Sequence, residues 1–302
     1  RPMRDEAFRG LFGEGFAEQY DRHKFIGQGG FGSVFEKPGD PSRVLKVQRL
    51  EQQKDIDRAG GEVEAQLRAA EAGIAPRLHS VETAPSSYTH RNSNRKAQIH
   101  IMEMDRVRNL MGLPGGMVKD QPLTQLLEDP QANRKFEYDF AKTRLALADK
   151  GVIHNDLNLY NAGRRSDHIG YDPVTGKMQI IDYGVTKIYD HAANLHSHNN
   201  NLNLQKETYE KKTPGEKVKH FLDHKLDAIV DGMYAVGNKE EADIFKGLYK
   251  ETVQKDLNQA NDLINQGQGI INRHSREDTD QQRKYMNGYD FLKTKVNGGK
   301  RK

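Results

Sequence analysis

Residues 151–161 of the chain read GVIHNDLNLYN. A short apolar approach leads to His154, a carboxylate follows at Asp156, and an amide follows five positions later at Asn161. The spacing is H-x-D-x-x-x-x-N. Segments rich in Asn and Asp also arise as ordinary turns. The interpretation of this stretch therefore depends on what the rest of the chain carries before and after it.

The composition limits the classes of protein to which the chain can belong. With 302 residues, of which 35% are hydrophobic, it is long enough for one two-lobed domain or two small ones. Its formal net charge of +4 is too small to indicate a dedicated nucleic-acid binder. The absence of cysteine excludes disulfides and Cys-ligated zinc. No apolar run reaches the length of a membrane span and no signal-peptide pattern opens the chain, so we expect no membrane span.

A glycine-rich stretch lies near the start of the chain, where residues 25–35 read FIGQGGFGSVF. The pattern G-x-G-x-x-G-x-V also opens dinucleotide-binding folds, but those need a helix to begin at the third glycine. Here Val34 and Phe35 continue as a strand, and a second strand is expected at 43–47. The glycines would let the backbone close over a phosphate group, with Phe31 at the tip. The alternative is a plain Gly-rich hairpin.

Lys46 interrupts the apolar second strand. Because the burial of an unpaired ammonium group is costly, a polar partner must lie nearby. The next helix is expected at 55–72 and carries two glutamates, Glu62 and Glu64. The family resemblance that the full set of motifs carries implies that the partner of Lys46 is a glutamate on this helix. We prefer Glu62, which lies beside the expected buried stripe, and expect Glu64 to face solvent. The stripe consists of Val63, Leu67, Ala70 and Ile74.

Further elements connect these motifs. Residues 81–97 are polar and predict a loop, and residues 98–104 predict an apolar strand that ends at Glu103 and Met104. A helix is expected at 133–150 and leads into the stretch quoted first.

A second set of elements follows that stretch. A hairpin is expected around a turn at 171–177, and its second strand, 178–181, runs into the triplet DYG at 182–184. An amphipathic helix opens with the capping box at 213–216, and another is expected at 240–257.

These motifs follow one another in the order found in the protein-kinase-like superfamily, which the chain resembles from residue 25 to residue 184. The resemblance implies an α+β fold of two lobes, with a small β-rich N-lobe and a reduced, mainly helical C-lobe. The expected domains are an N-terminal extension at 1–21, a kinase N-lobe at 22–105, a kinase C-lobe at 106–261 and a polar basic tail at 262–302.

The resemblance also implies roles for individual residues. Asp156 corresponds to the catalytic base that orients the acceptor hydroxyl, and Lys46 corresponds to the residue that grips the α- and β-phosphates of ATP and pairs with Glu62. Asn161 and Asp182 correspond to the ligands of Mg²⁺. The residues expected to bind the nucleotide are Ile26, Gly27, Gly29, Gly30, Phe31, Gly32, Val34, Lys46, Glu62, Glu103 and Met104.

The stretch departs from the common protein-kinase pattern at two positions. Asn155 stands where many protein kinases carry the Arg that binds a phosphorylated activation loop, and Asn158 stands where Ser/Thr kinases usually carry a Lys. His154 is expected to brace the loop and not to act in catalysis. No A-P-E triplet follows the DYG triplet, and the chain has no Trp. In these features it is similar to compact atypical kinases, namely Rio-type kinases and effector kinases of bacterial pathogens or viruses.

The resemblance therefore predicts an ATP- and Mg²⁺-dependent protein kinase that transfers the γ-phosphate to a hydroxyl group, that of Ser or Thr, on a protein substrate. The expected location is the cytoplasm, or the host cytoplasm if the kinase is exported or viral. Two alternatives stay open. One is a small-molecule phosphotransferase of the aminoglycoside or choline type, which Asn158 and the missing A-P-E triplet favour. The other is a non-catalytic kinase-like scaffold. Nucleic acid is an expected partner only through the basic tail.

Overall fold

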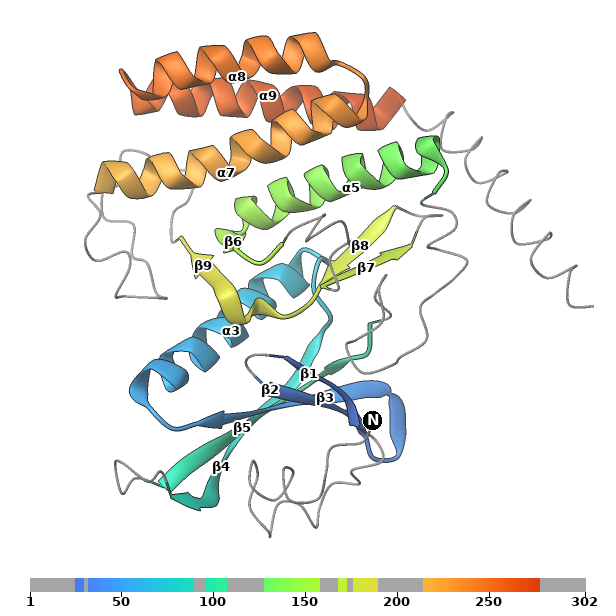
Figure 1. Ribbon diagram of the computed structural model, residues 1–302, viewed down its shortest axis with the longest axis vertical. Helices are drawn as coiled ribbons and strands as arrows, with labels where there is room; N and C mark the ends of the chain where they lie inside the picture. The colour runs from blue at the N-terminus through green and yellow to red at the C-terminus, as the bar shows by residue number, and fades with distance from the viewer. Residues whose placement is uncertain are drawn as a thin grey trace, which may run out of the picture. The chain divides into compact units, whose positions relative to one another are not determined.

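The computed structural model describes residues 25–29, 32–89, 96–107, 128–157, 168–172, 176–189 and 214–277. These residues form an α+β structure that divides into two units (Figure 1). The first unit comprises Arg1–Lys119, Asp156–Gly170 and Gln179–Thr186, and the second comprises Asp120–Asn155, Tyr171–Met178 and Lys187–Lys302. The first is built mainly on a sheet and the second mainly on helices.

The sheet of the first unit has five antiparallel strands in the order β1-β2-β3-β5-β4. The strands are β1 (Phe25–Gly29), β2 (Gly32–Lys37), β3 (Asp40–Leu50), β4 (Leu78–Thr89) and β5 (Lys96–Asp105). β1 and β2 pair from Gly29 and Gly32 onwards, so the glycine-rich stretch joins two strands as predicted. Ile26, Val44, Met102 and Met104 are buried together, and the apolar side chains that pack against them are Val34, Val63 and Leu78.

The loop predicted at 81–97 is wrong over its first half. Residues up to Thr89 belong to β4, which pairs with β5 along most of its length. β4 is one of the two edge strands of the sheet, and one face of an antiparallel sheet can remain in water. Its Ser, Thr and Glu residues therefore produce the same polar composition as a loop.

The buried face of α3 (Gln53–Glu71) also differs from the predicted stripe. Leu67 is 47% exposed, whereas the buried residues of the helix are Ala59, Gly61, Glu62, Ala65, Gln66 and Ala69. The apolar positions on this face are small, so they give little hydrophobic periodicity. Small side chains allow a helix to approach a sheet closely, and the two buried polar residues then need partners of their own.

The second unit begins with α5 (Pro130–Asp149). The Asp129 carboxylate accepts hydrogen bonds from the backbone N–H groups of Gln131 and Ala132, at 2.9 and 2.8 Å, and so caps the helix. Gly151 has a φ of 73° and follows the end of the helix, as predicted. β6 (Val152–His154) comes next and pairs with β9 (Thr186–Ile188). The other small sheet is the predicted hairpin of β7 (Ile169–Asp172) and β8 (Lys177–Ile180).

Three further helices complete the described part of the second unit, namely α7 (Pro214–Ala235), α8 (Lys239–Val253) and α9 (Leu257–Glu277). They share one apolar core with α5, to which α7 contributes most. α9 extends through residues expected to form a polar tail, and it buries Ala260, Ile264 and Ile271. One buried residue per turn or two is enough to fold this Asn- and Gln-rich segment against its neighbours.

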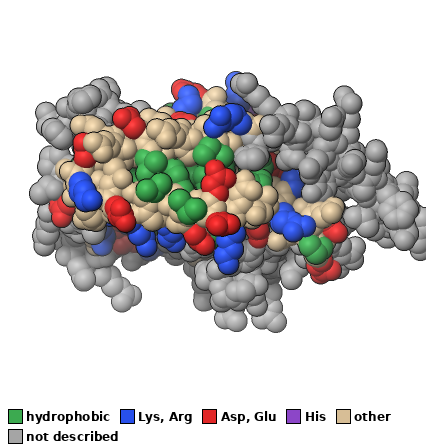
Figure 2. All heavy atoms as spheres, turned by 90° about the horizontal axis from the view of Figure 1, so that it is seen from above, with side chains coloured by type: hydrophobic (Ala, Val, Ile, Leu, Met, Phe, Trp, Pro, Cys, Tyr) green, Lys and Arg blue, Asp and Glu red, His purple; other side chains and the backbone are tan. Residues whose placement is uncertain are grey.

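α8 leaves two large apolar side chains on the surface of the second unit. Ile244 and Leu248 are one helical turn apart and are 59% and 51% exposed. Apolar side chains gather near the middle of the face seen in Figure 2. Within the part of the chain that the structure describes, no helix is both long and apolar enough to cross a membrane.

Candidate functional site

The ammonium group of Lys46 lies between two carboxylates of the first unit. Lys46 is in the central part of β3, opposite Met102 of β5, and is only 7% exposed. Its Nζ donates hydrogen bonds to Glu62 Oε1 on α3 and, at 2.7 Å, to Asp182 Oδ1. Three segments that are far apart in the sequence therefore meet at one cation.

The two carboxylates keep Lys46 charged. Burial by itself lowers the pKa of Lys46, because an ammonium group loses its hydration inside the protein. The carboxylates of Glu62 and Asp182 outweigh that effect, so the pKa of Lys46 lies above its ordinary value. The site thus holds a fixed positive charge of the kind that binds phosphate oxygens in other proteins.

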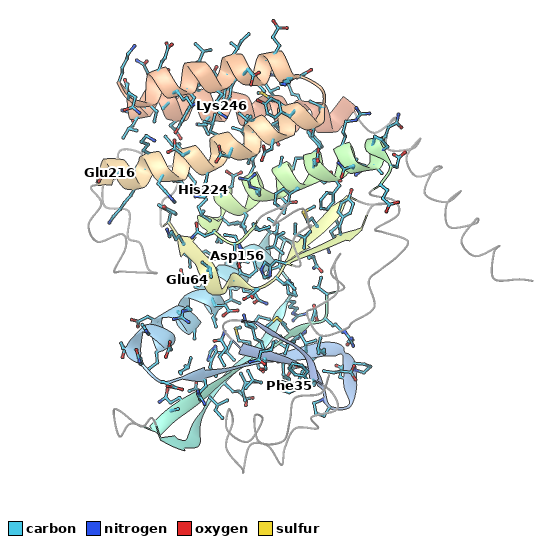
Figure 3. The ribbon with its side chains drawn as sticks, in the orientation of Figure 1. Phe35, Glu64, Asp156, Glu216, His224 and Lys246 are labelled. Atoms are coloured by element: carbon cyan, nitrogen blue, oxygen red, sulfur yellow. The ribbon has the colours of Figure 1, made fainter. Side chains whose placement is uncertain are left out.

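Glu62 is the partner of Lys46 on α3. Its side chain is 1% exposed, and its second oxygen, Oε2, accepts a hydrogen bond from Gln48 Nε2 at 2.6 Å. Glu64, which is labelled in Figure 3, instead pairs with Arg68 one turn further along the helix, at 2.5 Å, and 39% of its side chain is exposed. Of the two candidates from the sequence, the structure therefore pairs Glu62 with the lysine.

Asp182 follows β8 and has an unusual backbone conformation. With φ 63° and ψ 71° it is left-handed, and no other non-glycine residue in the described ranges has a positive φ. Such conformations cost free energy and concentrate at functional sites. Two backbone hydrogen bonds fix the chain just before it, from the N–H of Ile180 to Ile74 O at 2.6 Å and from the N–H of Ile181 to His168 O at 2.9 Å. They set the position from which the Asp182 carboxylate reaches the ammonium group.

Tyr183, the middle residue of the DYG triplet, anchors the segment that follows. It begins the single turn η2 (Tyr183–Val185), which contacts α3, and it is 1% exposed. Its carbonyl oxygen accepts a hydrogen bond from the Thr186 hydroxyl at 2.8 Å. Burial raises the pKa of Tyr183, so its phenol stays protonated.

Asp156 is the most exposed of the predicted site residues that the structure describes. It lies two positions beyond β6, 54% of its side chain is exposed, and its Oδ2 is 3.3 Å from His168 Nε2. His154 at the end of β6 is 7% exposed, which agrees with the bracing role expected of it. Asn161, the other predicted ligand of Mg²⁺, lies outside the described residues. The structure therefore gives the surroundings of Asp156 and Asp182 but not those of Asn161.

The glycine-rich stretch sits against β3. Ile26 is buried, and Val34 packs against the same apolar cluster. At Gly32 an added Cβ atom would lie 2.7 Å from the carbonyl oxygen of Val47, so only a glycine fits there without a shift of the backbone. The predicted contacts of Gly30 and Phe31 fall on residues outside the described ranges.

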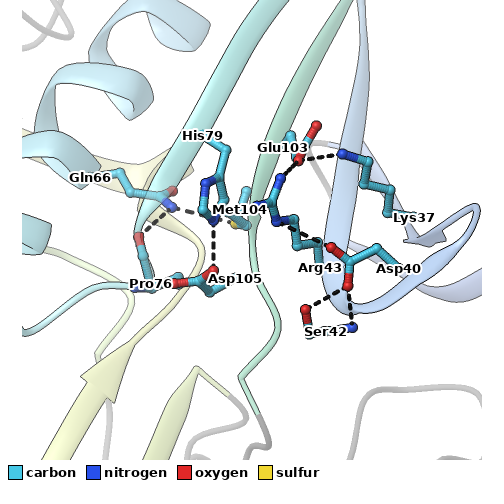
Figure 4. A network of polar contacts seen from close by, with 10 residues as sticks. All are labelled: Lys37, Asp40, Ser42, Arg43, Gln66, Pro76, His79, Glu103, Met104 and Asp105. Carbon is cyan, nitrogen blue, oxygen red and sulfur yellow. Dashed lines mark hydrogen bonds and ion pairs between the residues drawn. The ribbon is translucent and has the colours of Figure 1, made fainter.

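Glu103 and Met104, which the resemblance implies as residues that bind the adenine part of the nucleotide, lie inside the sheet. β5 is flanked by β3 and β4 at both residues. The Glu103 carboxylate accepts hydrogen bonds from Lys37 Nζ at 2.7 Å and from an Arg43 nitrogen at 2.6 Å (Figure 4), and these bonds lower the pKa of Glu103, the one from Lys37 most. Adenine binding there stays a prediction. The pairing of β5 with β3 ends at Asp105, the last residue of the strand.

Three residues near Lys46 and Asp182 were not predicted as site residues from the sequence. Gln48 is two positions after Lys46, so the period of a strand could have placed it on the same face. His168 contacts Asp156, and nothing in the sequence around it points to that contact. His100 is 5% exposed, and its Nε2 has no hydrogen-bond partner among the described residues.

No family model and no curated protein sequence matches this chain. The described residues supply a buried cation at Lys46, a partly exposed carboxylate at Asp182 and a more exposed carboxylate at Asp156. They contain no group of three or more His, Asp or Glu side chains that could hold a metal ion by themselves. A cation bound at Asp182 would need oxygen ligands from elsewhere, such as the substrate.

Proposed function

We propose that the chain is an ATP- and Mg²⁺-dependent protein kinase that transfers the γ-phosphate of ATP to a hydroxyl group of a protein substrate. The observation that carries the proposal is the position of Lys46 Nζ between Glu62 and Asp182. A lysine from the strand after a glycine-rich turn, a glutamate from the next helix and the aspartate of a D-x-G triplet are the groups that hold nucleotide phosphates in protein kinases.

The fold supports the same proposal at a coarser level. An antiparallel five-stranded sheet with one helix and a mainly helical second unit are compatible with the two lobes of a kinase-like fold. The antiparallel β1–β2 connection argues against a dinucleotide-binding fold, which needs a helix after its glycines.

The residues fit the groups that the proposal requires. Mg²⁺ is commonly bound through one or two carboxylates together with phosphate oxygens, and Asp182 offers one carboxylate of which about a quarter is exposed. Lys46 would donate to phosphate oxygens, and Asp182, with Asn161, would hold Mg²⁺. When bound, Mg²⁺ neutralises charge on the phosphates.

Asp156 has the access that a catalytic base needs. With 54% of its side chain exposed, it can meet the hydroxyl of an incoming protein substrate. It would accept the hydroxyl proton while that oxygen forms its bond to the γ-phosphorus and the bond to the leaving phosphate oxygen breaks. His168, 3.3 Å away, would limit the orientations of the carboxylate.

Transfer of labelled phosphate tests this function. The protein is incubated with γ-labelled ATP and Mg²⁺, alone, with generic protein substrates and with a panel of aminoglycosides, choline and other small hydroxyl compounds. Labelled protein that disappears with Asp182→Asn and with Asp156→Asn supports the proposal. Label on small molecules alone would favour a small-molecule phosphotransferase. If the wild-type protein does not bind nucleotide at all, the scaffold alternative holds and the enzyme proposal fails.

A further inference from the structure

Gln48 brings a third side chain to the buried pair of Lys46 and Glu62. It lies two positions after Lys46 on β3, so both side chains leave the same face of the strand. It is 5% exposed, and its Nε2 donates to Glu62 Oε2 at 2.6 Å, while Lys46 binds Oε1. Two donors from one strand thus hold the two oxygens of a single buried carboxylate.

This division of the oxygens fixes the orientation of the carboxylate. Only the NH₂ side of the Gln48 amide can face Glu62, because two oxygens would repel each other. If the Gln48 amide is removed, the buried Oε2 of Glu62 loses its hydrogen-bond donor, which costs free energy. The Glu62 carboxylate is then free to turn away from Lys46. Gln48 therefore acts on Lys46 through Glu62.

Gln48 also supports the end of the glycine-rich stretch. A Cβ atom at Gly32 would lie 2.9 Å from Gln48 Cγ, which shows how closely the backbone of β2 approaches this side chain. A shift of Gln48 would therefore disturb the strand that leaves the glycine stretch as well as the buried carboxylate.

The residue opposite Gln48 does not compete for Glu62. His100 pairs with Gln48 in the register of β3 and β5. Burial lowers the pKa of His100, and the charge of Lys46 lowers it further, so the imidazole stays neutral. Glu62 is left with Lys46 as its one cationic partner among the described residues and with Gln48 as its neutral donor.

We propose that Gln48 is a positioning residue of the phosphate-binding site, which holds Glu62 in the orientation that directs Lys46 toward the nucleotide and links that pair to the end of the glycine-rich stretch. The inference rests on the proposed kinase function. It assigns to Gln48 an effect on phosphate transfer that is exerted mainly through Glu62.

A double-mutant cycle with phosphate transfer as its readout tests this assignment. Gln48→Met keeps the length of the side chain and removes the donor. We expect kcat to fall by about tenfold to a hundredfold, the factor that corresponds to the free energy of one hydrogen bond to a buried charged group. In the Glu62→Gln background the same substitution should change kcat by less than about threefold, because the group through which Gln48 acts is already altered. Equal losses in both backgrounds would overturn the proposal.

Gln66→Met is the matched control. Gln66 is a second buried glutamine between α3 and the sheet, and its Nε2 donates to Pro76 O at 3.2 Å and contacts Met104 Sδ at 3.4 Å (Figure 4). Among the described residues, its side chain makes no hydrogen bond to the side chain of Glu62. Any change in kcat caused by Gln66→Met should therefore be the same in the wild-type background and in the Glu62→Gln background. If the effect of Gln66→Met on kcat also depended on Glu62, that result would count against a specific role of Gln48.

Gln48→Glu provides a pH readout that loss of packing would not produce. The new carboxylate faces Glu62 and repels it at neutral pH, but a single proton shared between the two restores a donor. We expect the kcat of Gln48→Glu, relative to wild type, to rise as the pH is lowered, because protonation of the pair replaces repulsion with a hydrogen bond. If the kcat of Gln48→Glu divided by that of wild type does not vary with pH, the positioning role of Gln48 is contradicted.

Failure of the proposed function can be told apart from failure of this inference. If the wild-type protein transfers no phosphate, the kinase proposal falls, and the cycle is repeated with the equilibrium constant of unfolding as its readout. Coupling between Gln48→Met and Glu62→Gln of about tenfold or more would still support the positioning of Glu62 by Gln48. Coupling below about twofold would overturn it, whatever the activity of the protein.

Discussion

Lys46 Nζ donates a hydrogen bond to Asp182 Oδ1 at 2.7 Å, across 136 positions of sequence. The same nitrogen binds Glu62, so one buried cation joins β3, α3 and the segment after β8. Because Lys46 has two anionic partners and Glu62 has one cationic partner among the described residues, the three residues should respond unequally to substitution.

The first prediction concerns this inequality. Lys46→Met should lower the free energy of unfolding by about 3 to 5 kcal/mol, because it leaves the Glu62 carboxylate buried without its cation. Glu62→Gln should cost less, since Lys46 keeps Asp182 as a partner. Urea denaturation followed by circular dichroism measures both values. The double variant should recover a large part of the loss, because no buried carboxylate at position 62 is then left without its lysine.

Glu64→Gln is the control for this comparison. Glu64 pairs with Arg68 on the exposed side of the same helix, and such pairs contribute less than about 0.5 kcal/mol. A cost of Glu62→Gln as large as that of Lys46→Met would show that Asp182 does not compensate the lysine.

The left-handed backbone of Asp182 gives the second prediction. Asp182→Gly and Asp182→Ala both remove the carboxylate, but only alanine keeps the strain of a Cβ atom at φ 63°. The glycine variant should therefore be more stable than the alanine variant by about 1 kcal/mol in urea denaturation. Gly39→Ala tests the same effect in the opposite direction, because Gly39 has a φ of 79° and open space around it. This variant should lower the free energy of unfolding by about 1 kcal/mol. Equal stability of the two Asp182 variants would mean that this backbone relaxes.

Activity of Asp156 variants supplies the third prediction. Asp156→Asn should lower kcat by about 10² to 10⁴ with little change in the KM for ATP, because the residue acts on the acceptor hydroxyl and not on the nucleotide. Asp105→Asn is the matched control: Asp105 is 49% exposed and is 2.6 Å from His79 Nε2 (Figure 4). It should keep kcat within about twofold of wild type. Equal losses for the two variants would point to a general effect of exposed Asp–His pairs.

The parts of the site near Lys46 follow from short-range patterns. The glycine stretch and the strand with a lysine follow from strand alternation. The preference for Glu62 over Glu64 is confirmed by the pairing of Lys46 with Glu62, although Leu67 of the stripe on which that preference rested is exposed. What the sequence could not supply is the position of Asp182 beside them. Its distance from Lys46 along the chain gives no periodic signal, and the expectation came from the order of the motifs.

β4 and α9 were missed, and the buried face of α3 was placed wrongly, for a common reason. β4 is a polar edge strand, α3 buries alanines and two polar side chains, and α9 folds with isolated buried residues in an Asn- and Gln-rich sequence. In each case the element is stabilised by its neighbours more than by its own hydrophobic periodicity. Tertiary contacts of this kind override local propensity.

The fourth prediction concerns pH and the second unit. His224 on α7 has a pKa of about 4, chiefly because of burial and further because of the charges of Arg144 and Lys187 (Figure 3). Its imidazole is therefore neutral in the folded protein down to that pH and becomes protonated at about 6.5 when the chain unfolds. The unfolded chain binds more protons between these values, so this contribution to stability is complete above pH 6.5 and is lost as the pH falls to about 4.

The contribution of His224 is isolated by comparison with His224→Gln. Between pH 6.5 and 4 the wild-type protein should lose up to about 3 kcal/mol more than the variant. Urea denaturation at a series of pH values measures this difference, and NMR titration of the histidine ring protons measures the pKa directly. Parallel stability curves for the two proteins, or a His224 signal that titrates near pH 6.5, would contradict the burial of this imidazole.

The fifth prediction compares two glycines of α9 that are two positions apart. At Gly267 an added Cβ atom would lie 2.5 Å from Phe245 Cζ of α8 and 3.0 Å from a methyl group of Ile229 on α7, whereas at Gly269 no atom lies within 4 Å. Gly267→Ala should therefore destabilise the protein by about 1 to 3 kcal/mol, because three helices meet at that point. Gly269→Ala should stabilise it by up to about 1 kcal/mol, the gain of alanine over glycine inside a helix. Thermal unfolding followed by circular dichroism measures both changes. If the two variants behave alike, α9 does not pack against α7 and α8 as the structure describes, and the chain beyond residue 262 would be the polar tail that its composition suggests.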